Sequence, residues 1–159
     1  MEKFTLKERM YLILLLFFTV THLNLHAQRT VTSIGSGNWS NPSIWDVNEI
    51  PKLGDQVVIN SQIDYDVNIF GSNALDQLII SGSGSLAIPS SNFLQIHTKV
   101  IRLANSATLD IKNGNVVVID SIYQEGGTLT LSGGNLTIEQ GDFSGGGGTL
   151  TLSGGNLTV

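Results

Sequence analysis

The chain has 159 residues, enough for one domain, and only 13% of them are charged. It contains no cysteine, which excludes a disulfide framework, a cysteine-ligated metal and a cysteine nucleophile. A net charge of −5 excludes the basic surface that nucleic-acid binding requires. We therefore expect no nucleic-acid partner and no cofactor.

Residues 1–27 have the pattern of a secretory signal peptide. Three basic residues open the chain, the run YLILLLFFTV at 11–20 is apolar, and Ala27 supplies a small residue for cleavage. The run is shorter than the roughly 20 apolar residues that a membrane-spanning helix needs. We expect cleavage between Ala27 and Gln28, no membrane span afterwards, and a location outside the cell or on its outer surface.

The segment 28–56 differs in character from the rest of the chain. It contains both tryptophans, Trp39 and Trp45, and two of the three prolines. The end of a stacked-strand fold exposes apolar surface and unpaired strand edges, which need a cover. We expect an N-terminal capping segment in which both tryptophans pack. The alternative is that Trp39 and Trp45 contact a glycan by stacking on sugar rings.

The same segment carries a motif that continues into the following residues. It consists of GNWSNP at 37–42, IW at 44–45 and PxxGDxVxI at 51–59. This pattern resembles the start of secreted and cell-surface parallel β-helix proteins of Bacteroidetes-type bacteria. It is also similar to the extracellular domain named for its eight glycines. The resemblance covers residues 37–88 and implies that PxxGDxVxI leads into the first strand of a β-helix.

Acidic residues near this motif are candidates for turns or for metal binding. Asp55 follows Gly54 and is expected to cap a turn by accepting backbone N–H bonds. Asp64 and Asp66 are two residues apart in an expected strand, so they should point to the same face. They could contribute to a calcium site, but Ca²⁺ takes six to eight oxygen ligands, and a solvated face is the alternative.

From residue 57 to 159 the chain repeats with a period near 21. GGTLTLSGGNLTI at 126–138 is followed by GGTLTLSGGNLTV at 147–159, and strict apolar/polar alternation predicts strands. Three series of apolar residues recur at intervals of 20 to 23 residues. They are Leu86, Leu109, Leu129 and Leu150; Leu94, Val116, Leu136 and Leu157; and Ile101, Ile122 and Phe143.

Three strands per period, separated by glycine-rich corners, predict an all-β fold. We expect a right-handed parallel β-helix, a three-sided solenoid of about 21 residues per coil. An antiparallel meander would need no such period. Because the chain stops at Val159 within a perfect repeat, we expect coils 57–159 to be truncated and their open edge to promote end-to-end self-association.

The sequence contains neither HExxH nor GxSxG, and we assign no catalytic, cofactor or metal residues. We expect a non-catalytic extracellular solenoid for adhesion or structural display. The alternatives are the N-terminal part of a polysaccharide-degrading β-helix enzyme and a carbohydrate-binding module, with an extracellular polysaccharide or cell-surface glycan as partner. Asp120-Ser121-Ile122 resembles the O-glycosylation acceptor pattern of Bacteroidetes-type secreted proteins, which makes Ser121 a candidate modification site.

Overall fold

The computed structural model describes residues 28–69, 74–90 and 94–159, so the expected signal segment 1–27, with Ala27, lies outside the described residues. Apart from one 3-10 helix, η1 (Pro42–Ile44), the regular elements in these ranges are β-strands. Within them no helix has the length and apolar character needed to cross a membrane.

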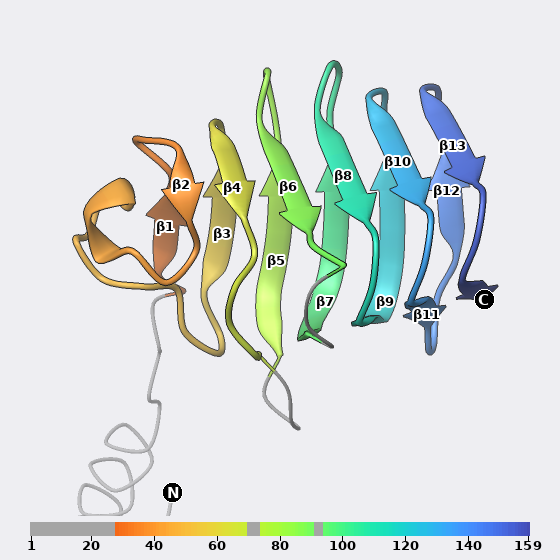
Figure 1. Cartoon of the computed structure of the whole chain (residues 1–159), viewed down its shortest axis with the longest axis horizontal. Coiled ribbons are helices and arrows are strands. Elements are labelled where there is room, and N and C mark those ends of the chain that lie inside the picture. The colour runs from red at the N-terminus through yellow and green to blue at the C-terminus, as the bar shows by residue number, and fades with distance from the viewer. Residues whose placement is uncertain (1–27, 70–73, 91–93) are drawn as a thin grey trace, which may run out of the picture.

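The strands form two parallel sheets. Both sheets extend along the same axis, with one in front of the other in Figure 1. The first sheet consists of β1 (Thr30–Thr32), β3 (Gln56–Ile59), β5 (Leu75–Ile80), β7 (Gln95–Leu103), β9 (Asn115–Gln124), β11 (Asn135–Ile138), β12 (Phe143–Gly145) and β14 (Asn156–Thr158). The second consists of β2 (Gly37–Asn38), β4 (Gln62–Asp64), β6 (Ser85–Ile88), β8 (Thr108–Ile111), β10 (Thr128–Leu131) and β13 (Thr149–Leu152).

The prediction of an all-β parallel solenoid is confirmed, with about five turns and a spacing of about 21 residues. Two of the three predicted series pair in the expected register. Leu86, Leu109, Leu129 and Leu150 are neighbours across the second sheet. Ile101, Ile122 and Phe143 are neighbours across the first.

Each coil has three sides, although the strands form only two sheets. The first ladder of paired strands contains β1, β3, β5, residues 100–103, residues 121–124 and β12. The second ladder is the second sheet, and the third contains residues 95–98, residues 115–118, β11 and β14. The long strands β7 and β9 each pass through the third and first sides, with a register shift between Thr98 and Val100, and this joins the two ladders in one sheet.

The predicted register of the third ladder is wrong by two residues at one position. The sequence spacing placed Leu94 beside Val116, whereas the structure pairs Ile96 with Val116. Leu94 and Ile96 both point inward and are both buried. A slip of two residues keeps the same face inside, so the apolar pattern does not distinguish the two registers.

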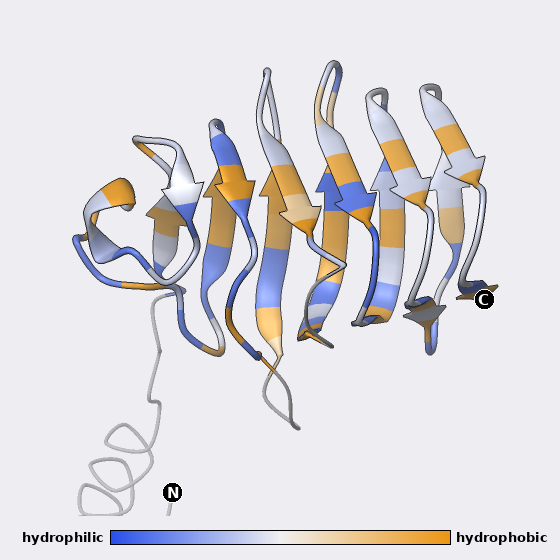
Figure 2. Cartoon of the chain, in the orientation of Figure 1, coloured by the Kyte–Doolittle hydropathy of each residue, from blue (hydrophilic) through white to orange (hydrophobic). Residues whose placement is uncertain are grey.

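The core consists of inward-pointing side chains stacked from coil to coil. Figure 2 shows apolar bands at matching positions on successive strands. Residues such as Leu78, Leu109 and Leu131 are at most 1% exposed, and burying each Leu or Ile contributes roughly 1.5–3 kcal/mol. β1 and β2 pair in parallel with β3 and β4, so the parallel pairing already begins within the segment 28–56.

The corners between strands bring the backbones of successive coils close together. Gly134 has a φ of +69°, and a Cβ atom placed there would lie 2.4 Å from the carbonyl oxygen of Gly114 in the coil before it. Gly82 has a similar φ of +59°, but a Cβ atom there would meet no atom within 4 Å. A comparison of the two glycines therefore distinguishes the cost of a left-handed backbone from the cost of crowding between coils.

Replacing Gly134 with alanine should destabilise the fold more than replacing Gly82 with alanine. The left-handed backbone costs alanine about 1–2 kcal/mol at either position. Only Gly134→Ala adds an overpacking cost, of roughly 1–3 kcal/mol, because the new methyl group meets the backbone of the neighbouring coil. Urea unfolding followed by circular dichroism measures both losses, and equal losses would contradict the role of inter-coil contact.

Candidate functional site

Three aromatic side chains fill the interior near the start of the solenoid. Trp39, Trp45 and Tyr65 are each at most 1% exposed. The ring centroid of Trp39 lies 5.1 Å from that of Trp45 and 5.2 Å from that of Tyr65, in edge-to-face arrangements. The indole N–H of Trp45 donates to the carbonyl oxygen of Trp39 at 3.0 Å, so its polar atom is paired inside the protein.

The burial of Trp39 and Trp45 decides between the two interpretations of these residues. Stacking on a sugar requires an exposed ring face, and neither tryptophan has one. The interpretation of these two rings as glycan contacts is therefore wrong. Both rings pack inside the first coils instead.

Tyr65 connects the aromatic group to the next coil. Its hydroxyl donates to the carbonyl oxygen of Gln95 at 2.7 Å and accepts from the backbone N–H of Ile69 at 3.1 Å. Burial raises the pKa of Tyr65 above its usual value, so the hydroxyl stays protonated and remains a donor.

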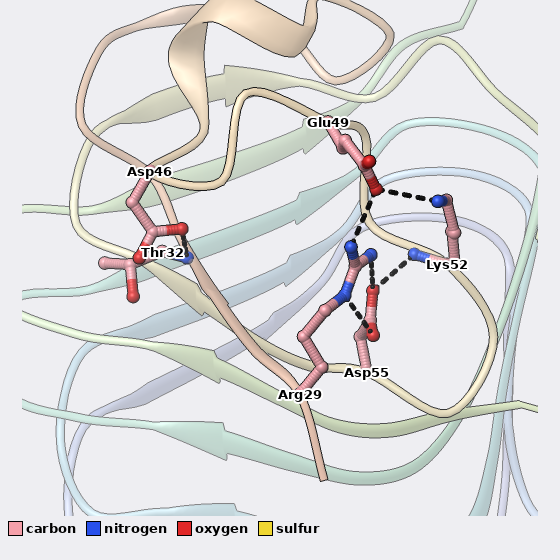
Figure 3. Close-up of polar contacts among 6 residues, drawn as sticks. All are labelled: Arg29, Thr32, Asp46, Glu49, Lys52 and Asp55. Carbon is pink, nitrogen blue, oxygen red and sulfur yellow. Dashed lines mark hydrogen bonds and ion pairs between the residues drawn. The ribbon is translucent and has the colours of Figure 1, made fainter. Parts of the chain in front are cut away.

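The segment around Asp46 closes the outer edge of β1 (Figure 3). The backbone N–H of Ile34 donates to the carbonyl oxygen of Ile44 at 2.8 Å, and that of Asp46 donates to Thr32 at 2.9 Å. The Asp46 carboxylate accepts from the backbone N–H of Thr32, also at 2.9 Å. These bonds satisfy groups that would otherwise form an open strand edge.

Beside this edge, Arg29 binds two carboxylates (Figure 3). Its Nε and Nη2 atoms donate to the two oxygens of Asp55 at 2.9 and 2.6 Å, and its Nη1 donates to Glu49 at 2.9 Å. Lys52 contacts the same acids: its backbone N–H donates to Asp55 at 2.6 Å and its Nζ to Glu49 at 2.7 Å. The four residues form one charge network.

The network confirms one prediction and adds a partner that the sequence analysis missed. Asp55 caps a turn, as expected, by accepting the backbone N–H of Lys52. It is also buried and forms a bidentate pair with Arg29, 26 residues earlier in the chain. The hydrogen bond to Asp55 raises the pKa of Arg29 further above its usual value. Hydrogen bonds from Lys52 and Arg29 lower the pKa of Glu49.

An open hollow of about 460 Å³ lies next to this network. Asp76 and Lys99 line it and form an ion pair of 2.6 Å, which raises the pKa of Lys99. Gln28, the first residue after the expected cleavage point, is exposed at the same hollow and also donates from Nε2 to Asp76. Each charged side chain that lines the hollow is thus paired with a side chain of opposite charge.

The other acidic candidates lie on the surface. Asp64 and Asp66 are both exposed on either side of the buried Tyr65, but β4 ends at Asp64, so Asp66 lies outside the strand that was expected to hold both residues. Asp66 accepts from the backbone N–H of Ser40 at 2.8 Å and from its hydroxyl at 2.5 Å. Across the described ranges, no three His, Asp or Glu side chains come together as a metal site.

Ser121, the candidate O-glycosylation site, lies within β9 and is half-buried. Its hydroxyl accepts from the backbone N–H of Asp142 at 3.2 Å, in the coil that follows. Asp120, immediately before it, is exposed. Modification of Ser121 stays a prediction.

A second hollow, of about 650 Å³, follows the outer face of the third ladder. Its asparagine side chains stack on one another: Nδ2 of Asn135 donates to Oδ1 of Asn115 at 2.7 Å, and Nδ2 of Asn156 donates to Oδ1 of Asn135 at 2.9 Å. Thr137 and Thr158 lie two residues further along the same strands. This amide ladder was not predicted from the sequence, although the repeated GGN corner was its signal.

A comparison with protein families matches residues 44–159 to the G8 domain. The match begins at residue 44, so it leaves out residues 37–43 of the expected resemblance, and it extends past residue 88 to include the later coils. No curated protein and no solved structure matches the chain.

Replacing Asp55 with alanine should destabilise the protein by about 1–3 kcal/mol, because Arg29 and the Lys52 N–H lose a charged, buried acceptor. Glu49→Ala is the matched control, since Glu49 contacts the same Arg29 and Lys52 but its side chain is 53% exposed. Urea unfolding at low and high salt compares them. We expect a smaller, salt-sensitive loss for Glu49→Ala. Equal losses for the two variants would contradict the structural role of Asp55.

Proposed function

Because the chain belongs to the G8 domain family, we propose that it forms a non-catalytic extracellular β-solenoid region of a secreted or surface-displayed protein. Its role in this proposal is adhesion or structural display. The G8 domain is typically extracellular, and the matched residues include most of the coils. We also propose that the protein comes from a bacterium of the Bacteroidetes type.

The observation that carries the proposal is that charged side chains form ion pairs between coils. Arg29–Asp55, Asp76–Lys99 and Arg102–Glu125 are ion pairs between residues 26, 23 and 23 positions apart. Each separation is about one coil, so these pairs join successive coils of the stack. A glycosidase would instead need two carboxylates facing one scissile bond. The charges therefore support a role in holding the solenoid together.

Export and cleavage can be tested on the full 159-residue chain in a bacterial host. We expect the protein outside the cytoplasm with Gln28 as its new N-terminus, because residues 1–27 have the basic, apolar and small-residue order of a signal peptide. N-terminal sequencing and intact mass measure the cleavage point. An uncleaved chain retained in the cytoplasm would contradict the extracellular proposal.

The exported protein can then be incubated with acidic and neutral polysaccharides. A structural region should release no fragments from any of them, and size-exclusion analysis of the polysaccharide measures this. Depolymerisation by the purified protein would overturn the non-catalytic proposal and favour the polysaccharide-degrading alternative.

A second candidate function, binding of a neutral glycan, is favoured by the amide ladder. A side-chain amide has two N–H donors and two acceptor lone pairs. At Asn135 the ladder uses one N–H and one lone pair, which leaves one donor and one acceptor for a ligand. Sugar hydroxyls can both donate and accept, and the residues that line this hollow are uncharged.

Asn135→Ala should weaken binding of a neutral glycan about tenfold, the effect of losing roughly 1.4 kcal/mol of hydrogen bonding. Thr130→Ala is the control, because Thr130 lies in the same coil but on the second ladder. A glycan array, with circular dichroism to verify the fold, compares the two variants. Equal binding by both would place the glycan elsewhere, and no binding at all would leave only the structural proposal.

A further inference from the structure

The corner between β8 and β9 differs from the equivalent corners of the two coils that follow. It reads NGN at 113–115, whereas the later corners read GGN at 133–135 and 154–156. The parallel pairing of β9 with β11 and of β11 with β14 makes the three corners equivalent. One coil therefore has an asparagine where the next two have a glycine, and this asparagine forms the one Asn-Gly pair in the sequence.

The side chain of Asn113 lies against the backbone nitrogen of the residue that follows it. The N–H of Gly114 donates to Oδ1 of Asn113 at 2.8 Å, and no backbone carbonyl in the described residues accepts from the same N–H. Because Oδ1 is bonded to Cγ, the nitrogen also lies close to the side-chain carbonyl carbon. At the other end of the carboxamide, Nδ2 donates to the carbonyl oxygen of Ser90 at 3.2 Å, which holds the group in this position.

Gly114 leaves this nitrogen without a side chain beside it. Its φ is +86°, a left-handed conformation that favours glycine. A Cβ atom there would lie 2.2 Å from the carbonyl oxygen of Leu94, so the coil before it also excludes a larger residue. Asn113 is half-buried, so water reaches its side chain. An amide carbon, a nearby backbone nitrogen and solvent therefore meet at this corner.

We propose that Asn113 is a self-modification site, at which the side-chain amide is lost through a cyclic imide with Gly114. The Gly114 nitrogen gives its proton to the solvent and attacks Cγ of Asn113. The N–Cγ bond forms, the Cγ–Nδ2 bond breaks, and Nδ2 leaves as ammonia after taking a proton from the solvent. Water then adds to one of the two imide carbonyls. Opening at Cγ gives aspartate, and opening at the backbone carbonyl gives isoaspartate.

Both products disturb the corner, and isoaspartate disturbs it more. Each replaces a donor by a carboxylate that faces the carbonyl oxygen of Ser90. Isoaspartate also lengthens the backbone by one atom, because the chain then runs through Cβ and Cγ. The corner is fixed on both sides: the N–H of Asn115 donates to Leu94 at 2.8 Å, and the carbonyl of Gly114 accepts from Asn135 at 2.8 Å. The modification therefore adds a negative charge and loosens the pairing of β9 with its neighbours.

The test incubates the folded protein in mildly alkaline buffer, beside a sample unfolded in guanidinium chloride. Peptide mapping by mass spectrometry detects the change from amide to acid at Asn113 and distinguishes aspartate from isoaspartate by fragmentation. We expect the folded protein to react at a rate within about tenfold of the unfolded chain, because the corner already holds the reacting atoms together. Conversion in the unfolded sample alone would overturn the proposal.

The same maps contain an internal control, Asn60, which is exposed and is followed by a serine. Its Oδ1 accepts from the hydroxyl of Ser81 at 2.6 Å. The N–H of Ser61 donates to Ser33 at 3.2 Å, so the nitrogen that would attack is directed elsewhere. Asn60 should stay unmodified in the folded protein. Conversion at Asn60 as fast as at Asn113 would overturn the proposal, since solvent exposure alone would then explain both.

Asn113→Gly is the matched variant, because it gives this corner the GGN sequence of the next two coils. Circular dichroism verifies its fold, and ion-exchange chromatography separates acidic forms of the protein. The unsubstituted protein should accumulate an acidic form with time, and Asn113→Gly should lose that form. Equal accumulation by the two proteins would contradict the assignment to Asn113.

Discussion

The whole structure depends on the parallel pairing of each coil with the coil before it. Neighbouring strands must lie about 4.8 Å apart and in register, so every coil has to return the chain to the same place in cross-section. Leu109, Leu129 and Leu150 show the result, since they stand beside one another across three coils. Differences in coil length therefore have to be absorbed by the corners and not by the paired strands.

The same spacing explains the residues at the corners. When coils lie this close, one corner stands directly on another, and a side chain pointing along the axis would meet backbone. A Cβ atom at Gly155 would lie 2.5 Å from the carbonyl oxygen of Gly134, which repeats the relation between Gly134 and Gly114. The asparagine after each glycine pair then stacks on its equivalent, and its amide bonds along the axis. Tight corners and the amide ladder are thus two consequences of one spacing.

Much of the fold could be predicted from the sequence because its main signal is periodic. Alternation identified the strands, and the repeat identified their partners in parallel. The pattern could not separate Leu94 from Ile96 as the neighbour of Val116, since both side chains point inward. Nor could it show that the first and third sides share β7 and β9, because continuity of a strand through a corner depends on backbone geometry and not on side-chain polarity.

The residues outside the repeat were harder to place. Asp55 was predicted correctly as a turn cap from its local position after Gly54. Its partner Arg29 lies a coil away, in a region without periodic apolar spacing, so no local pattern connects them. The sequence predicted that both tryptophans pack in the capping segment, but it predicted neither the contact of Trp39 with Trp45 nor that with Tyr65, because these contacts depend on how the first coils close.

The contrast between the first and last coils follows from their sequences. The first coils contain features that the later repeats lack: the two tryptophans, the 3-10 helix η1 and the charged network around Arg29. The last coil copies the strands TLTL and NLT from the coil before it. In the earlier copy, coils on both sides bury the leucines at Leu129 and Leu131. The leucines of the last coil are identical, so they too are buried only when a coil lies on each side. The last coil therefore has the chemistry of an interior coil. Any surface that covers it must supply paired strand edges and inward apolar side chains.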